Sequence, residues 1–111
     1  ESKFSDPLHS VMFSQDRLKE FIPRLEKLKK LLGNEATTLP ELALRYLLSW
    51  EEVSTVIPGT RKVKYVEKNT SVSDGKKLSP QLMAELKKHA WERNYYVDMD
   101  PAMKDMGYIE V

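Results

Sequence analysis

The chain lacks cysteine, long apolar runs and a large excess of charge of either sign. Without thiols it can form neither disulfides nor thiolate metal sites, and this composition is typical of a reducing compartment. A helix that spans a bilayer needs about 20 consecutive apolar residues. The sequence shows no such run and no signal peptide. We therefore expect a cytoplasmic protein with no membrane partner.

Basic and acidic residues are almost equal in number, 18 and 17, and the net charge is +1. No global field therefore favours nucleic acid or an anionic membrane. Locally, residues 60–93 carry nine basic and four acidic residues, whereas residues 94–111 carry four acidic and one basic. The basic stretch also contains Tyr65 and Trp91, a combination that single-stranded nucleic acid binding uses. A small helical interaction or nucleic-acid-binding module using residues 60–93 is one hypothesis, although its few aromatics fall at spacings typical of a core.

Most of the chain has the apolar spacing of α-helices, and we expect about four to five of them. The first is predicted from Ser14 to Gly33-Asn34, with a kink or a break near Ile22 because Pro23 follows. A capping-box pattern, Thr38-Leu39-Pro40-Glu41, predicts a second helix that runs to about Ser49 or Trp50. Residues 1–13 are interpreted as a loop and residues 98–111 as an irregular acidic tail.

The last two predicted helices cover about 63–70 and the segment that begins at Ser79-Pro80, a cap followed by proline at the first helical position. Leu78 is expected to pack against Met83 at the start of the last helix. Leu82, Leu86 and Ala90 are expected to face inward.

A single strand is predicted, at residues 53–57, where β-branched residues stop at Pro58-Gly59. Thr60, Arg61, Lys62 and Lys64 follow at once, and then a short amphipathic helix. The order strand, turn, basic loop, helix suits phosphate, because helix N-terminal N–H groups and an arginine fork both bind anions. Taken alone, this run of cations is more often a solvated charged surface.

The surrounding motifs resemble the C-terminal segment of aldo-keto reductases. Leu42-Ala43-Leu44-Arg45-Tyr46-Leu47-Leu48 is similar to the family's last helix before its eighth barrel strand, and Ser54-Thr55-Val56-Ile57-Pro58-Gly59-Thr60-Arg61 to that strand and the following loop. Leu78-Ser79-Pro80-Gln81-Leu82 resembles the start of the closing helix, and the resemblance covers most of residues 14–97. It implies an α/β fold, the C-terminal part of a TIM (β/α)8 barrel. Such barrels need about 250 residues, so we expect this chain of 111 residues to supply only the last third.

The resemblance also implies a cofactor, NADP(H), and a set of residues that would bind it. Arg61 is suited to the 2′-phosphate that distinguishes NADPH from NADH, because its guanidinium is always charged and can bind two phosphate oxygens. Gly59 would let the backbone approach the ligand closely. Lys68 departs from the acidic residue that the family commonly has there. The implied cofactor-binding residues are Ile57, Pro58, Gly59, Thr60, Arg61, Tyr65, Lys68 and Asn69.

Catalysis in the family uses a tyrosine acid supported by lysine, aspartate and histidine, and no segment of this chain matches any of those four motifs. Tyr46 is interpreted as a core residue, and no catalytic or metal-binding residue is predicted. We therefore expect an NADP(H)-binding portion of an oxidoreductase that does not turn over alone. Its expected partners are the cofactor and either the remainder of a barrel or a second copy, since a lone strand and a helix apolar on most faces leave apolar surface exposed.

Overall fold

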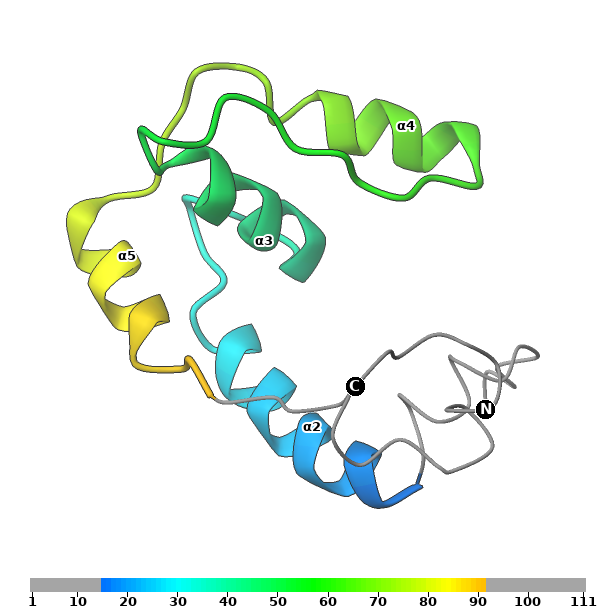
Figure 1. Ribbon diagram of the computed structural model, residues 1–111, viewed down its shortest axis with the longest axis vertical. Helices are drawn as coiled ribbons and strands as arrows, with labels where there is room; N and C mark the ends of the chain where they lie inside the picture. The colour runs from blue at the N-terminus through cyan, green and yellow to red at the C-terminus, as the bar shows by residue number, and fades with distance from the viewer. Residues whose placement is uncertain (1–14, 92–111) are drawn as a thin grey trace, which may run out of the picture. The chain divides into compact units, whose positions relative to one another are not determined.

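The computed structural model describes residues 15–91, and their regular structure is entirely helical (Figure 1). The helices are α2 (Gln15–Lys29), α3 (Leu39–Leu48), α4 (Val63–Thr70) and α5 (Pro80–Lys87). The chain forms two compact units: of the described residues, 15–23 and 91 belong to the first and 24–90 to the second. The predicted loop at residues 1–13, the helix start at Ser14 and the acidic tail at 98–111 lie outside the described residues.

Helix α2 runs without interruption through Pro23, so no break occurs near Ile22. Proline removes one backbone N–H, which would otherwise bond to the carbonyl of Lys19. Lys19 and Pro23 are both exposed, so water can satisfy that carbonyl and the helix tolerates the loss. The helix ends at Lys29, four residues before Gly33, and tighter turn bonds follow, such as the 3.0 Å bond from Leu31 N–H to the Leu28 carbonyl.

A small apolar core lies in the second unit. Ala36, Leu42 and Leu78 are buried, and they come from the segment before α3, from α3 itself and from the segment before α5. The partly buried residues packed around them are Leu32, Leu39, Tyr46, Leu82, Met83 and Leu86. This confirms the predicted core roles of Tyr46, Leu82 and Leu86. The prediction for Ala90 is wrong, because α5 ends at Lys87 and Ala90 is exposed.

Helix α3 begins where its capping pattern predicts. The Thr38 hydroxyl accepts a hydrogen bond from the Glu41 N–H at 3.3 Å. The Glu41 carboxylate accepts from both the N–H and the hydroxyl of Thr37, each at 2.9 Å. In the usual capping box the Glu41 carboxylate would accept the N–H of the N-cap residue, Thr38. Here it accepts the N–H of Thr37, the residue before the N-cap.

The predicted strand at residues 53–57 does not form. Strands are stable only when a neighbour satisfies their backbone groups, and no described residue supplies one. Within residues 15–91, the backbone of residues 54–61 neither donates nor accepts a hydrogen bond. Val56 is half-buried, whereas the Ile57 side chain is 96% exposed. The helices of residues 15–91 also include none that is long and apolar enough to cross a bilayer.

Candidate functional site

The predicted cofactor residues fall on one exposed stretch, the loop at residues 57–61 and helix α4. Gly59, Thr60 and Arg61 are all exposed. A Cβ atom built on Gly59 would meet nothing within 4 Å, so packing within the described residues does not require glycine there.

The N-terminus of α4 is open. Its N-cap residue, Lys62, is extended (φ −137°, ψ 141°) and makes no side-chain capping bond, and the first turn has no acidic residue. The N–H groups of Tyr65 and Val66 bond to the Lys62 carbonyl at 2.9 and 3.2 Å. The N–H groups before them have no acceptor within the helix, and the positive end of the helix dipole lies there.

Arg61 stands immediately before this helix end. Within the described part of the chain, the side chains of Thr60 and Arg61 form no hydrogen bond or ion pair. A hydroxyl, a guanidinium and a helix N-terminus therefore follow one another in sequence with their donors free for a ligand. Such a combination can bind an anion with several phosphate oxygens.

The three remaining predicted residues share one face of α4. Tyr65, Lys68 and Asn69 are spaced at i, i+3 and i+4, which places them side by side on a helix. Tyr65 is 45% exposed, and the Lys64 ammonium lies 5.1 Å from the centre of its ring. Lys68 is exposed and Asn69 is half-buried. The face thus offers an aromatic ring, a cation and an amide to the solvent.

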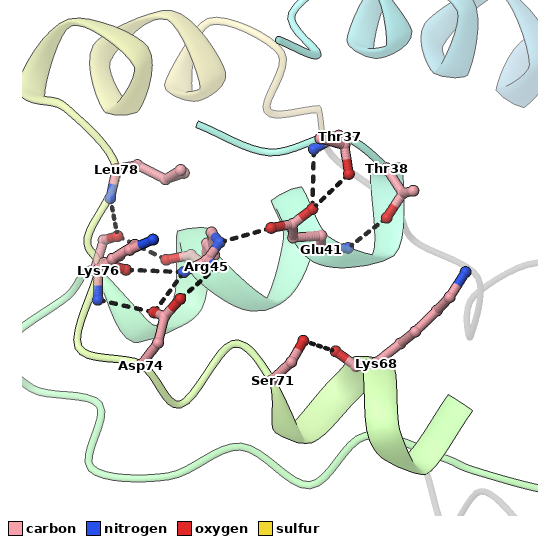
Figure 2. A network of polar contacts seen from close by, with 10 residues as sticks. Thr37, Thr38, Glu41, Arg45, Lys68, Ser71, Asp74, Lys76 and Leu78 are labelled. Carbon is pink, nitrogen blue, oxygen red and sulfur yellow. Dashed lines mark hydrogen bonds and ion pairs between the residues drawn. The ribbon is translucent and has the colours of Figure 1, made fainter. Parts of the chain in front are cut away.

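The main polar network of the described residues was not predicted from the sequence, and it joins α3 to the segment after α4 (Figure 2). Arg45 of α3 is buried, at 7% exposure, and its Nη1 and Nη2 atoms donate to the two carboxylate oxygens of Asp74 at 2.9 Å each. Its Nε atom donates to Glu41 at 3.0 Å. Nη1 also donates to the Lys76 carbonyl at 3.2 Å. This bidentate pair fixes the segment after α4 to α3.

The turn at residues 73–75 is shaped to present Asp74 to that arginine. Gly75 has a φ of +75°, a left-handed conformation that glycine adopts without strain. Asp74 Oδ1 accepts the N–H of Lys76 at 2.9 Å, the bond of an Asx-turn. The Glu41–Arg45 spacing and the Asp-Gly turn are the signals in the sequence from which this network could have been predicted.

The hydrogen bonds of the network shift the pKa values of its three ionisable side chains so that the charged form of each is favoured. The hydrogen bonds from Arg45, with that from the Lys76 N–H, hold the pKa of Asp74 far below its usual range. The bond to Asp74 raises the pKa of Arg45 above its already high value. The Thr37 N–H and then the Arg45 side chain lower the pKa of Glu41. All three groups are therefore charged at neutral pH.

Two further contacts hold the start of α5. Ser49 at the end of α3 donates to the Arg45 carbonyl at 2.6 Å and accepts the Leu78 N–H at 2.9 Å. Glu35 accepts the N–H and the hydroxyl of Ser79 at 2.6 and 2.9 Å. The segment between α4 and α5 is thus fixed to α3 and to Glu35, whereas the loop at 54–61, on the other side of α4, has no such contact within the described residues.

Other features of the described residues do not coincide with the predicted site. A hollow of about 460 Å³ lies between the end of α3 and α5, where the Lys87 ammonium is 4.5 Å from the centre of the Trp50 ring. It contains none of the predicted cofactor residues. No group of three His, Asp or Glu residues within 15–91 is arranged to hold a metal ion.

Comparison with known proteins identifies the family. The family model described as the aldo/keto reductase family matches residues 2–90, which include the loop, α4 and the Arg45 network. No curated protein and no solved structure matches the chain at a significant level. The family implies a TIM barrel, and four helices without a strand in residues 15–91 are consistent with an isolated segment of one. The chain belongs to the aldo-keto reductase family, as a C-terminal segment of its barrel.

Proposed function

We propose that this chain carries the part of an NADP(H)-dependent aldo-keto reductase that binds the adenosine 2′-phosphate. The proposal is supported above all by one observation: the uncapped N-terminus of α4 directly follows Thr60 and Arg61, whose side chains are unengaged within the described residues. In barrel enzymes the loops after the seventh and eighth strands frequently hold a phosphate beside the N-terminus of a short helix.

Each residue has a distinct role in this proposal. Arg61 binds the 2′-phosphate through its guanidinium fork, and Thr60 adds a hydroxyl donor. Gly59 lets the pyrophosphate side of the ligand approach the backbone, as its open surroundings permit. Tyr65, Lys68 and Asn69 contact the adenosine from their common face of α4. Hydride transfer belongs to the nicotinamide at the other end of the cofactor.

Contacts inside the chain argue against the nucleic-acid alternative. Lys87 lies over the Trp50 ring, and Lys88 forms an ion pair with Glu85 at 2.6 Å. Two cations of the basic stretch are therefore partly compensated by their own chain. Four of the other seven cations of this stretch lie in α4 or directly before it, where a single phosphate ligand would use them: Arg61, Lys62, Lys64 and Lys68.

The Arg61→Ala variant tests whether Arg61 binds the 2′-phosphate. A charge-assisted hydrogen bond contributes about 1.5–3 kcal/mol, or roughly 10- to 100-fold in affinity. In calorimetric titrations at low salt we expect the chain to prefer 2′,5′-ADP to 5′-AMP, weakly because the loop is unsupported, and Arg61→Ala to abolish that preference. Thr60→Ala should reduce it less, because a neutral hydroxyl makes a weaker bond.

Lys30→Ala is the matched control, since it removes an exposed cation in the turn after α2. It should change both affinities only slightly. Equal losses for the two ligands in Arg61→Ala would show that Arg61 does not read the 2′-phosphate. Tighter binding of a single-stranded oligonucleotide than of 2′,5′-ADP would instead support the nucleic-acid hypothesis.

A further inference from the structure

We infer that Arg45 and Asp74 position the proposed 2′-phosphate site, although neither residue belongs to it. Arg45 donates through Nη1 and Nη2 to the two carboxylate oxygens of Asp74, at 2.9 Å each, and the two residues are 29 positions apart. All eight residues of the proposed site lie between them in the chain. The ion pair thus closes the segment that carries the site. This inference rests on the proposed function.

The connection from α4 to Asp74 has little freedom. The Ser73 N–H donates to the carbonyl of Thr70, the last residue of α4, at 3.0 Å. Val72, which lies between them, is buried at 4% exposure. Cα atoms of α3 and α4 also come within 8 Å of each other. The C-terminal end of α4 is therefore held relative to Asp74, and through Asp74 to α3 (Figure 2).

The other end of the site also starts from α3. Trp50 follows the end of this helix, and its carbonyl accepts the Val53 N–H at 3.2 Å, directly before the loop at residues 54–61. A ligand that binds Gly59, Thr60 and the N-terminus of α4 at once needs the loop and the helix in one relative arrangement. The start of the loop is tied to α3 by the chain itself, and the ion pair ties the end of α4 to the same helix.

A rigid helix transmits a small change at one end to the other. Helix α4 has eight residues, which corresponds to a length of about 12 Å. A tilt of about 5° about its C-terminal end moves its N-terminus by roughly 1 Å, and displacements of that size weaken precisely oriented contacts strongly. Loss of the ion pair also adds conformations to the closed segment, and ligand binding must then remove them.

All contacts in this argument lie within residues 39–76, so it requires nothing of the residues that pair with 53–57 in a barrel. The sign of the effect separates positioning from charge. Asp74→Asn removes one negative charge, and by Coulomb attraction alone this change strengthens the binding of an anion. If Asp74 positions the site, the same change weakens anion binding. The two explanations therefore predict opposite results.

Calorimetric titration of the full chain with 2′,5′-ADP at low salt tests the inference. We expect Asp74→Asn to weaken binding roughly 2- to 30-fold, the range for residues that act on a site without touching the ligand. Asp16→Asn makes the same charge change on an exposed side chain of α2 and should bind as tightly as the wild type or slightly more tightly. Ser79→Ala lowers stability outside the closed segment. It should leave the affinity unchanged at a temperature at which circular dichroism shows every variant to be folded.

Gly75→Ala tests the same link without a change of charge. Its φ of +75° strains any side chain in the turn that presents Asp74, although a Cβ there would meet nothing within 4 Å. Gly33→Ala is the matched control, because its surroundings are equally open and its φ is not positive. We expect weaker binding of 2′,5′-ADP in Gly75→Ala and unchanged binding in Gly33→Ala. This pair decides the question if Asp74→Asn does not fold.

The outcomes distinguish this inference from the proposed function. Binding by Asp74→Asn that is as tight as by Asp16→Asn would overturn the positioning role. An equal loss in Ser79→Ala would overturn it as well, because general destabilisation would then account for the effect. The proposed function would survive both results if Arg61→Ala still abolished the preference for 2′,5′-ADP over 5′-AMP. A wild-type chain without that preference would overturn both.

Discussion

At the residue scale, Arg45 shows how one buried charge organises a small domain. A guanidinium at 7% exposure is tolerated because two carboxylates and a carbonyl accept its hydrogen bonds. Removing one partner of a buried pair leaves an uncompensated charge, which costs far more than an exposed pair contributes. The exposed pairs on α2, such as Asp16–Lys19 at 3.0 Å, have no comparable role.

The pH dependence of stability should report this network. The pKa of Asp74 in the folded chain lies below its ordinary value of 3.8, so the ionised carboxylate stabilises the fold above that value. The contribution is lost as the pH falls towards the folded pKa. Glu41 acts in the same direction, because its pKa is also lowered. We expect the urea midpoint to fall steadily from pH 5 to pH 2.

Asp74→Asn should lower the midpoint at pH 7 and flatten its pH dependence, with a residual slope from Glu41. Asp16→Asn removes a carboxylate whose side chain is 91% exposed, and it serves as the control. Urea unfolding followed by circular dichroism at several pH values measures both. An unchanged slope in Asp74→Asn would mean that other groups govern the acid sensitivity.

At the scale of single elements, α4 and α5 have the same length but differ in how their N-termini are capped. Both have eight residues, yet α5 begins with a side-chain cap from Ser79 and α4 begins with none. The hydroxyl of Ser79 accepts the Leu82 N–H at 3.2 Å, and Glu35 holds Ser79 in turn. Short helices are marginal by themselves. We therefore interpret α5 as a structural helix, whereas the open end of α4 is available to a ligand.

Ser79→Ala should destabilise the chain measurably. Loss of an N-cap of this kind costs about 0.5–2 kcal/mol, and the Glu35 carboxylate also loses one of its two bonds. Ser54→Ala is the control, because Ser54 is exposed and unbonded within the described residues, and it should change the free energy of unfolding by less than about 0.5 kcal/mol. Equal urea midpoints for the two variants would contradict the capping role.

At the scale of the whole molecule, the helical core is small and residues 53–57 form no strand. The main core cluster of the second unit contains three buried residues and the partly buried residues packed against them, and Val72, after α4, is buried as well. The loop at residues 54–61 has no bond to that core within residues 15–91. Contacts within the described residues therefore do not fix its conformation.

We expect the purified chain of 111 residues to show no NADPH-dependent reduction of an aldehyde. The reason is that no segment matches the family's motifs for the tyrosine acid and its lysine, aspartate and histidine. The measurement is the decrease in NADPH absorbance with a reactive aldehyde. Turnover that persists after further purification and disappears on Arg61→Ala would contradict the expectation.

The sequence by itself determined the helix starts, because these depend on neighbours a few residues apart. The cap at Thr38, the Ser79-Pro80 start and the i, i+3, i+4 face of α4 all follow from local spacing. The family assignment followed from local motifs in the right order, and the family model confirms it. The eight predicted cofactor residues remain a prediction, although the structure places them on one exposed stretch.

Only the tertiary structure decided which partners meet across the chain. Asp74 lies 29 positions from Arg45, and Glu35 lies 44 positions from Ser79, so no local pattern could pair them. The strand predicted at residues 53–57 also depends on partners that are distant in sequence. Its β-branched sequence favours an extended backbone, but a strand forms only when a neighbour satisfies its backbone groups, and residues 15–91 provide none. Helices satisfy their own backbone, and for this reason they were predictable here while the strand was not.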